Sequence, residues 1–118
     1  MKDYKELEVW QKVIDLVSSL YEVSGTFSDN EKFGLTSQVR RAATSVPANI
    51  AEGWGRGSTK EYVQFLHVAR GSLLELETHL IIAHRLGFLS GDLTAAAHKQ
   101  VESIGMMLNR LIGRLRAR

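Results

Sequence analysis

Cysteine is absent from this 118-residue sequence, which excludes disulfides, cysteine-ligated metals and thiolate nucleophiles. Proline occurs once, and the Asn-Gly and Asp-Gly pairs that favour two-residue hairpin turns do not occur, so a β protein is disfavoured. No apolar run approaches the roughly 20 residues needed to span a bilayer, and charges interrupt the N-terminal stretch where a secretory signal would be uncharged. We therefore expect a soluble, cytoplasmic, all-α protein that does not bind membranes.

Composition favours one globular domain, and its charge is unevenly distributed. Hydrophobic residues make up 44% and charged residues 24% of the sequence, enough apolar surface for the core of a single domain covering residues 1–118. Residues 1–31 contain three bases and seven acids, a net charge of −4, whereas residues 32–118 contain twelve bases and six acids, a net charge of +6. A surface that binds a polyanion is therefore expected in the second segment.

Apolar residues recur every three or four positions in four segments, which is the spacing of amphipathic helices. The expected helices cover about residues 3–24, 29–54, 59–86 and 91–116. The loops between them are short, and short loops place consecutive helices antiparallel. The predicted fold is a single antiparallel up-down-up-down four-helix bundle.

Capping signals mark the start of two of these helices. Ser28 with Glu31, and Ser58 with Glu61, have the spacing of a capping box, in which each side chain satisfies a backbone donor of the first helical turn. The second and third helices are therefore expected to begin just after these serines.

The core-facing stripe of the first helix is predicted to contain its large aromatic residues, and a left-handed Gly25 is predicted to end that helix. The stripe consists of Leu7, Trp10, Ile14, Val17 and Tyr21.

Two helices also carry apolar residues outside their core-facing stripes. In the first helix these residues are offset by more than a quarter turn from the stripe of Trp10, and in the third they lie opposite the main stripe. Because a lone bundle buries one face of each helix, we expect a homo-oligomer interface. The alternative is a wide core-facing stripe with scattered exposed apolar side chains. The seven candidate interface residues are Val9, Val13, Leu16, Leu20, Val63, Leu74 and Ile81.

No pattern of catalytic or metal-ligating residues emerges. The four histidines, at positions 67, 79, 84 and 98, are never three or four residues apart, so they cannot form a helical metal-binding pair. Glu75 and Glu77 are two residues apart and point to different sides of a helix. No nucleotide-binding or nucleophile motif is present. We therefore expect no catalytic residues, metal or cofactor, and a protein that is not an enzyme.

Two groups of basic residues are candidate nucleic-acid contacts, because cationic groups bind phosphate and a nearby aromatic ring, such as Trp54, can stack on a base. One group lies on about one side of the last helix, and the other flanks the loop between the second and third helices. The alternatives are an ordinary solvated face with cations at a helix C-terminus, and a core role for Trp54. The eight residues are Lys99, Arg110, Arg114, Arg118, Arg40, Arg41, Arg56 and Lys60.

Several stretches together resemble a known family across nearly the whole chain. Residues 34–53 read GLTSQVRRAATSVPANIAEG, residues 57–66 read GSTKEYVQFL, residues 69–78 read ARGSLLELET, and residues 7–12 read LEVWQK. They are similar to the hallmark segments of the four-helix-bundle proteins encoded by intervening sequences of bacterial 23S ribosomal RNA genes.

This resemblance implies an up-down bundle, assembly into a homopentameric ring and no known catalytic activity. The accessory proteins of diversity-generating retroelements, which bind RNA and a reverse transcriptase, look like distant relatives. Two functions are therefore weighed: an oligomeric RNA- or DNA-binding module that uses the basic faces, and a protein-interaction scaffold such as an accessory subunit of a reverse transcriptase.

The polar members of the first hallmark segment fall along one flank of the second helix, beside its apolar stripe. They are Gln38, Ser45, Asn49 and Glu52. We expect structural hydrogen bonds there, for example from Asn49 to Glu75 or Arg70; the alternative is a polar cleft that contacts a ligand.

Overall fold

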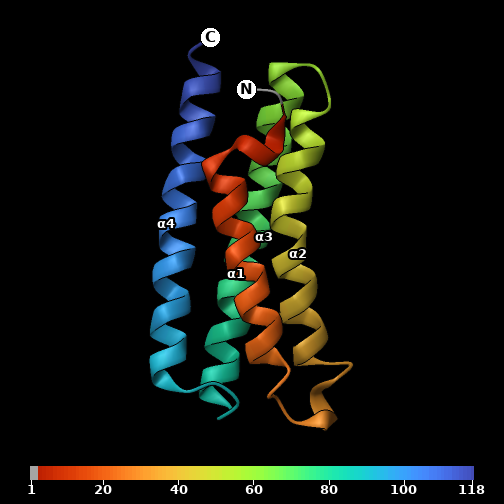
Figure 1. The fold of residues 1–118 in the computed structure, drawn as a ribbon, viewed down its shortest axis with the longest axis vertical. Helices are drawn as coiled ribbons and strands as arrows, with labels where there is room; N and C mark the ends of the chain where they lie inside the picture. Colours follow the sequence, from red (N-terminus) through yellow and green to blue (C-terminus); the bar gives the residue numbers. More distant parts are fainter. Residues whose placement is uncertain (1–2) are drawn as a thin grey trace.

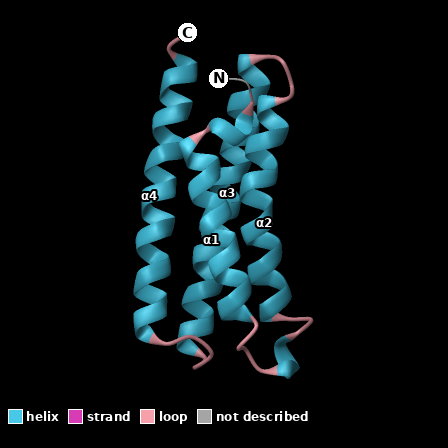
Figure 2. Cartoon of the chain, viewed as in Figure 1, coloured by secondary structure: helices cyan, strands magenta, loops and turns pink. Residues whose placement is uncertain are grey.

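The computed structural model describes residues 3–118 and forms a bundle of four long helices within them. Figure 1 shows these helices running alternately up and down, each beside the next one in the chain. Figure 2 shows only helices and loops, and no strand occurs in residues 3–118. The predicted all-α four-helix fold is therefore confirmed. The helices are α1 (Glu8–Ser24), α2 (Leu35–Trp54), α3 (Thr59–Arg85) and α4 (Gly91–Arg116).

Helix α1 begins later than predicted. Residues Tyr4–Glu6 form a separate 3-10 turn, η1. Asp3 caps this turn, because its carboxylate accepts from Lys5 N–H at 2.8 Å. Leu7 then has extended backbone angles, so α1 begins at Glu8 instead of near residue 3. The predicted left-handed end at Gly25 is wrong as well, because its φ is −64°.

The start of α2 is also displaced. Residues Asp29–Glu31 form a second 3-10 turn, η2, and the Ser28 hydroxyl accepts from Asn30 N–H instead of Glu31 N–H. The Glu31 carboxylate accepts from Leu35 N–H at 3.2 Å, so Glu31 caps α2 from the preceding turn. The predicted capping box at this end is therefore wrong.

The predicted start of α3 is confirmed. The Ser58 hydroxyl oxygen accepts from Glu61 N–H at 3.2 Å and the same hydroxyl faces the Glu61 carboxylate at 3.1 Å. Ser90 caps α4 in the same way by accepting from Leu93 N–H.

The buried face of α1 matches the predicted one only in part, because Leu7, Trp10 and Val17 of the predicted stripe are half-buried against the core. Four residues expected at an oligomer interface are core residues with exposed fractions of 1–4%: Val9, Val13, Leu16 and Leu20. In the predicted stripe, Ile14 is 36% and Tyr21 43% exposed. The residues of the buried stripe face the other three helices, whereas Ile14 and Tyr21 lie at the edge of this contact. The α1 part of the predicted interface is therefore wrong.

Helices α2 and α3 make the most extensive helix contact of the bundle, and α1 and α4 the least extensive. Small residues allow this close approach, since a Cβ atom added at Gly53 would lie 2.7 Å from the Cβ of Phe65. Ala42 and Ala69 are also buried between the helices. The loose side of the bundle, between α1 and α4, is where a surface groove forms.

Candidate nucleic-acid interface

A groove of about 650 Å³ lies between the N-terminal half of α1 and the C-terminal half of α4. Three cationic side chains line it, Lys12 from α1 and Arg110 and Arg114 from α4. Its lining also includes one carboxylate, Glu8, and apolar residues such as Met107. We call it the α1–α4 groove. Cations beside apolar side chains are suited to an anionic ligand that also presents flat apolar surface.

The charge of the groove follows from the end of the sequence. Residues 103–118 contain four arginines and no Asp or Glu, and Arg110 and Arg114 are one helical turn apart on the same face. None of the ion pairs formed within residues 3–118 includes Lys12, Arg110 or Arg114. Their charges are therefore available to a ligand.

Lys12 is the groove residue that sequence reasoning missed. It lies in residues 1–31, whose net charge is −4, whereas the sequence predicted a polyanion-binding surface in residues 32–118. Only the packing of α1 beside α4 brings its ammonium group to the arginines. No signal in the sequence pairs Lys12 with residues almost 100 positions away.

The two remaining predicted basic residues, Lys99 and Arg118, lie outside the α1–α4 groove. Lys99 lies on the same side but about 16 Å along the helix from Arg110, at 1.5 Å per residue. Arg118 lines a second hollow of about 250 Å³ together with Trp54 and Tyr62. Burial raises the pKa of the Tyr62 phenol, and the Arg118 charge partly offsets that rise. A guanidinium group and two aromatic rings thus meet at this end of the bundle.

Two predicted arginines are held by contacts within the chain. Arg40 donates to the Ser24 hydroxyl oxygen at 2.9 Å and to the Tyr21 carbonyl oxygen at 3.0 Å. Arg56 lies 3.8 Å from the Glu52 carboxylate and 3.7 Å from the Glu61 carboxylate, with its guanidinium group over the Phe65 ring. These side chains stabilise helix ends.

The other two predicted residues, Arg41 and Lys60, are exposed. Arg41 lines a hollow with Phe33 near the start of α2, whereas Lys60 lies in the first turn of α3. About 20 Å of helix separates Arg41 from the α2–α3 loop, at 1.5 Å per residue. The structure therefore does not bring the second predicted group together.

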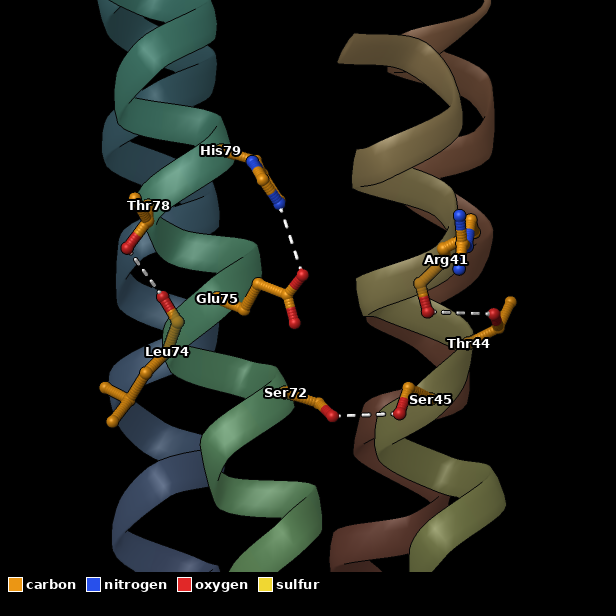
Figure 3. Close-up of polar contacts among 8 residues, drawn as sticks. All are labelled: Arg41, Thr44, Ser45, Ser72, Leu74, Glu75, Thr78 and His79. Carbon is orange, nitrogen blue, oxygen red and sulfur yellow. Dashed lines mark hydrogen bonds and ion pairs between the residues drawn. The ribbon is translucent and has the colours of Figure 1, made fainter. Parts of the chain in front are cut away.

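The polar hallmark residues of α2 lie at its contact with α3. Figure 3 shows Ser45 and Ser72 pointing toward each other, with 2.8 Å between their hydroxyl oxygens. Asn49 donates to the Ser45 carbonyl oxygen at 2.7 Å and to its hydroxyl oxygen at 3.0 Å. The predicted bond from Asn49 to Glu75 or Arg70 is therefore wrong, because the Asn49 amide donates to Ser45, one turn earlier on the same helix, and Arg70 donates to Asn109.

The other two hallmark residues lie closer to solvent. Glu52 pairs with Arg56, and Gln38 is exposed beside a hollow of about 420 Å³ that Glu75 also lines. Figure 3 shows Glu75 and His79 of α3 reaching toward each other over this side, with 3.5 Å between their polar atoms. Of the four polar hallmark residues, Ser45 therefore makes the hydrogen bond to α3, Asn49 bonds within α2, and Gln38 and Glu52 lie toward solvent.

The outer face of α3 retains part of the predicted interface. Leu74 is 58% and Ile81 48% exposed, and Val68 and Ile82 add to the same exposed helix. Val63 is partly buried and packs against the core. Leu74 and Ile81 are therefore the predicted interface residues that a neighbouring molecule can reach.

Comparison with known proteins identifies the fold and the family. The chain matches the family described as 23S rRNA-intervening sequence protein over residues 5–110. A solved structure, a protein with unknown function from the S23 ribosomal protein family of Bacteroides thetaiotaomicron, superimposes with a TM-score of 0.82 at 21% sequence identity, covering 89% of this chain and 95% of that one. No curated protein matches significantly. None of the helices in residues 3–118 is long and apolar enough to cross a membrane. This protein belongs to the 23S rRNA-intervening sequence protein family.

Proposed function

We propose that this protein is a non-enzymatic, homo-oligomeric RNA-binding module that contacts the phosphate backbone through the α1–α4 groove. The observation that carries this proposal is the convergence of Lys12, Arg110 and Arg114 in one groove with no intramolecular ion pair among the described residues. Unpaired cations keep their hydration and counterions until a polyanion releases them.

Oligomerisation makes a modest site effective. One groove supplies three cations and therefore few phosphate contacts, but a symmetric assembly repeats the groove, and each further contact is made at high local concentration. The exposed apolar side chains Leu74 and Ile81 of α3 support self-association on another part of the surface. Binding and assembly thus use different faces.

The test is neutralisation of the groove in nuclease-treated protein. In the variant Lys12→Gln/Arg110→Gln/Arg114→Gln, we expect weaker binding to a single-stranded RNA and a shallower dependence of log K on log salt concentration. Loss of three phosphate contacts reduces the slope by about 2, at about 0.7 per phosphate of a single strand. Fluorescence anisotropy across several salt concentrations measures both quantities.

The matched control replaces cations elsewhere: Lys32→Gln/Arg41→Gln/Arg85→Gln removes the same charge from exposed positions outside the groove. We expect this variant to bind RNA nearly as the parent does. Equal losses in the two variants would mean that net charge and not the groove governs binding, and this would refute the assigned site.

A protein-interaction scaffold is the second candidate, and one observation favours it. Phe33 is 90% exposed in the segment before α2, beside Arg41 and Lys32. A fully exposed aromatic ring is costly in water and is a frequent anchor of protein interfaces. If Phe33→Ser abolishes binding to a purified partner protein while RNA binding is unchanged, the scaffold function is supported.

A further inference from the structure

Four polar side chains of α3 and α4 converge on the bundle surface near the end of α4. Arg70 lies with its Nη2 2.9 Å from His67 Nδ1, and Arg116 lies with its Nη2 2.9 Å from His67 Nε2. Arg70 also donates through Nη1 to the Asn109 side-chain oxygen at 2.7 Å. We call His67, Arg70, Asn109 and Arg116 the His67 cluster.

The cluster contains more hydrogen-bond donors than acceptors. Arginine donates but cannot accept, and a neutral imidazole has only one accepting nitrogen. Both ring nitrogens of His67 nevertheless face a guanidinium group at 2.9 Å. At any moment, one of these contacts must place an N–H group against another N–H group. One N–H group therefore has no acceptor within the cluster and is free to donate to a further acceptor.

The charges of the cluster are likewise uncompensated. None of the ion pairs within the described range 3–118 involves Arg70 or Arg116. Burial first, and then the charges of Arg70 on α3 and Arg116 on α4, lower the pKa of His67 below its usual range. Two guanidinium charges therefore face an imidazole whose protonation they oppose. A bound anion would compensate the guanidinium charges and would weaken their opposition to protonation of His67.

We propose that the His67 cluster is a binding site for a phosphate group. The Arg70 and Arg116 guanidinium groups and the Asn109 amide supply N–H donors from two helices, and a phosphate offers several accepting oxygens on one centre. Arg116 and Asn109 are exposed while His67 and Arg70 are partly buried, so the anion enters from solvent and meets the ring. With a phosphate bound, His67 can protonate and donate as well.

The site extends the proposed RNA surface to a second side of α4. Arg110 and Arg114 face α1 in the α1–α4 groove, whereas Asn109 and Arg116 contact α3. The assignment of the phosphate to an RNA backbone rests on the proposed function. The anion chemistry of the cluster does not depend on it, and free phosphate is the other source of the same group.

The experiment is a titration of the 118-residue protein with inorganic phosphate at constant ionic strength, followed by the His67 imidazole signals in NMR spectra. Phosphate is expected to shift these signals and to move the pKa of His67 upward, whereas the same ionic strength of sodium chloride is not. Arg116→Gln is expected to abolish the response. Arg110→Gln, which removes the same charge from the other side of α4, is expected to retain it.

Either of two results would overturn the site: an equal response to phosphate and chloride, or a phosphate response that survives in both Arg116→Gln and Arg70→Gln. Far-UV circular dichroism tests whether each variant is folded. Two single variants are used so that a local structural change in one of them cannot decide the result.

A second arm distinguishes the sources of the phosphate. If a single-stranded RNA displaces inorganic phosphate from His67, and Arg116→Gln weakens RNA binding, the ligand is a phosphodiester backbone. If RNA leaves the phosphate response unchanged, the site stands as one for free phosphate. If the parent protein binds no RNA but still responds to phosphate, the proposed function is refuted and the phosphate site is not.

Discussion

Arg40 of α2 donates a hydrogen bond of 2.9 Å to the hydroxyl oxygen of Ser24, the last residue of α1. The same guanidinium group binds the Tyr21 carbonyl oxygen and lies 4.5 Å from the centre of the Tyr21 ring. The Tyr21 carbonyl oxygen also accepts from Gly25 N–H at 3.1 Å. Because the C-terminal end of a helix carries partial negative charge, a cation at this position stabilises the end of α1. Arg40 thus joins α1 and α2.

Arg40→Ala is therefore expected to destabilise the fold. Ser24 is 1% exposed, and its hydroxyl loses a charged donor in a buried position, so the free energy of unfolding is expected to fall by about 1–3 kcal/mol. Urea denaturation followed by circular dichroism measures this change. The neighbouring Arg41→Ala serves as control and is expected to change stability by less than about 0.5 kcal/mol, because Arg41 is exposed. Similar values for the two variants would contradict the structural role of Arg40.

Gly53→Ala is expected to destabilise the contact between α2 and α3. The added Cβ would lie 2.7 Å from the Phe65 Cβ, an atom that cannot move without its backbone, so the helices must separate. Overpacking of this kind costs about 1–3 kcal/mol. Thermal unfolding measures the loss.

Gly71→Ala is the matched control, because nothing lies within 4 Å of a Cβ at this position of α3. Here alanine is expected to stabilise the isolated chain by about 0.5–1 kcal/mol, since glycine is a poor helix former. If Gly53→Ala stabilised the protein as Gly71→Ala does, the close contact of α2 with α3 would be refuted.

The fold was predictable because helical periodicity and capping residues act locally. Ser58 caps α3 through an atom three residues away, and this spacing is visible in the sequence. Which of the two apolar stripes of α1 is buried depends on the other helices and not on the local sequence. Val13 and Ile14 are equally apolar neighbours, and only the positions of the other helices bury Val13 and expose Ile14.

The candidate sites were less predictable than the fold. Arg110 and Arg114 share a helix face, and the sequence indicated them, but Lys12 joins them only through the packing of α1. In the His67 cluster, the spacing of three residues between His67 and Arg70 was a usable signal, whereas Arg116 arrives from a different helix. Contacts between helices depend on how the helices are aligned and rotated against one another, and the apolar periodicity of one helix does not determine this arrangement.

Leu74→Lys/Ile81→Lys is expected to prevent the proposed self-association, and so to lower the molecular mass in solution, without unfolding the chain. Both side chains are about half exposed on the outer face of α3, so a lysine at either position remains solvated in a free subunit but opposes burial against a neighbour. Light scattering measures the mass, and circular dichroism the helix content. Ile14→Lys, at an exposed position on α1, is expected to leave the mass unchanged. An unchanged mass in the double variant would contradict a self-association interface on this face of α3.

Acidification is expected to destabilise the fold through His67. Because burial and the nearby arginines lower its pKa in the folded state below the ordinary value of 6.5, the unfolded chain binds more protons between these two values. The contribution of His67 to stability is therefore complete above about pH 6.5 and is lost as the pH falls through the folded pKa. Urea denaturation at pH 7.5 and 5.5, in buffer without phosphate, is expected to show a smaller loss in His67→Gln than in the parent. His79→Gln serves as control for the other histidines. An equal loss in the parent and His67→Gln would mean that burial and the two arginines do not lower the pKa of His67.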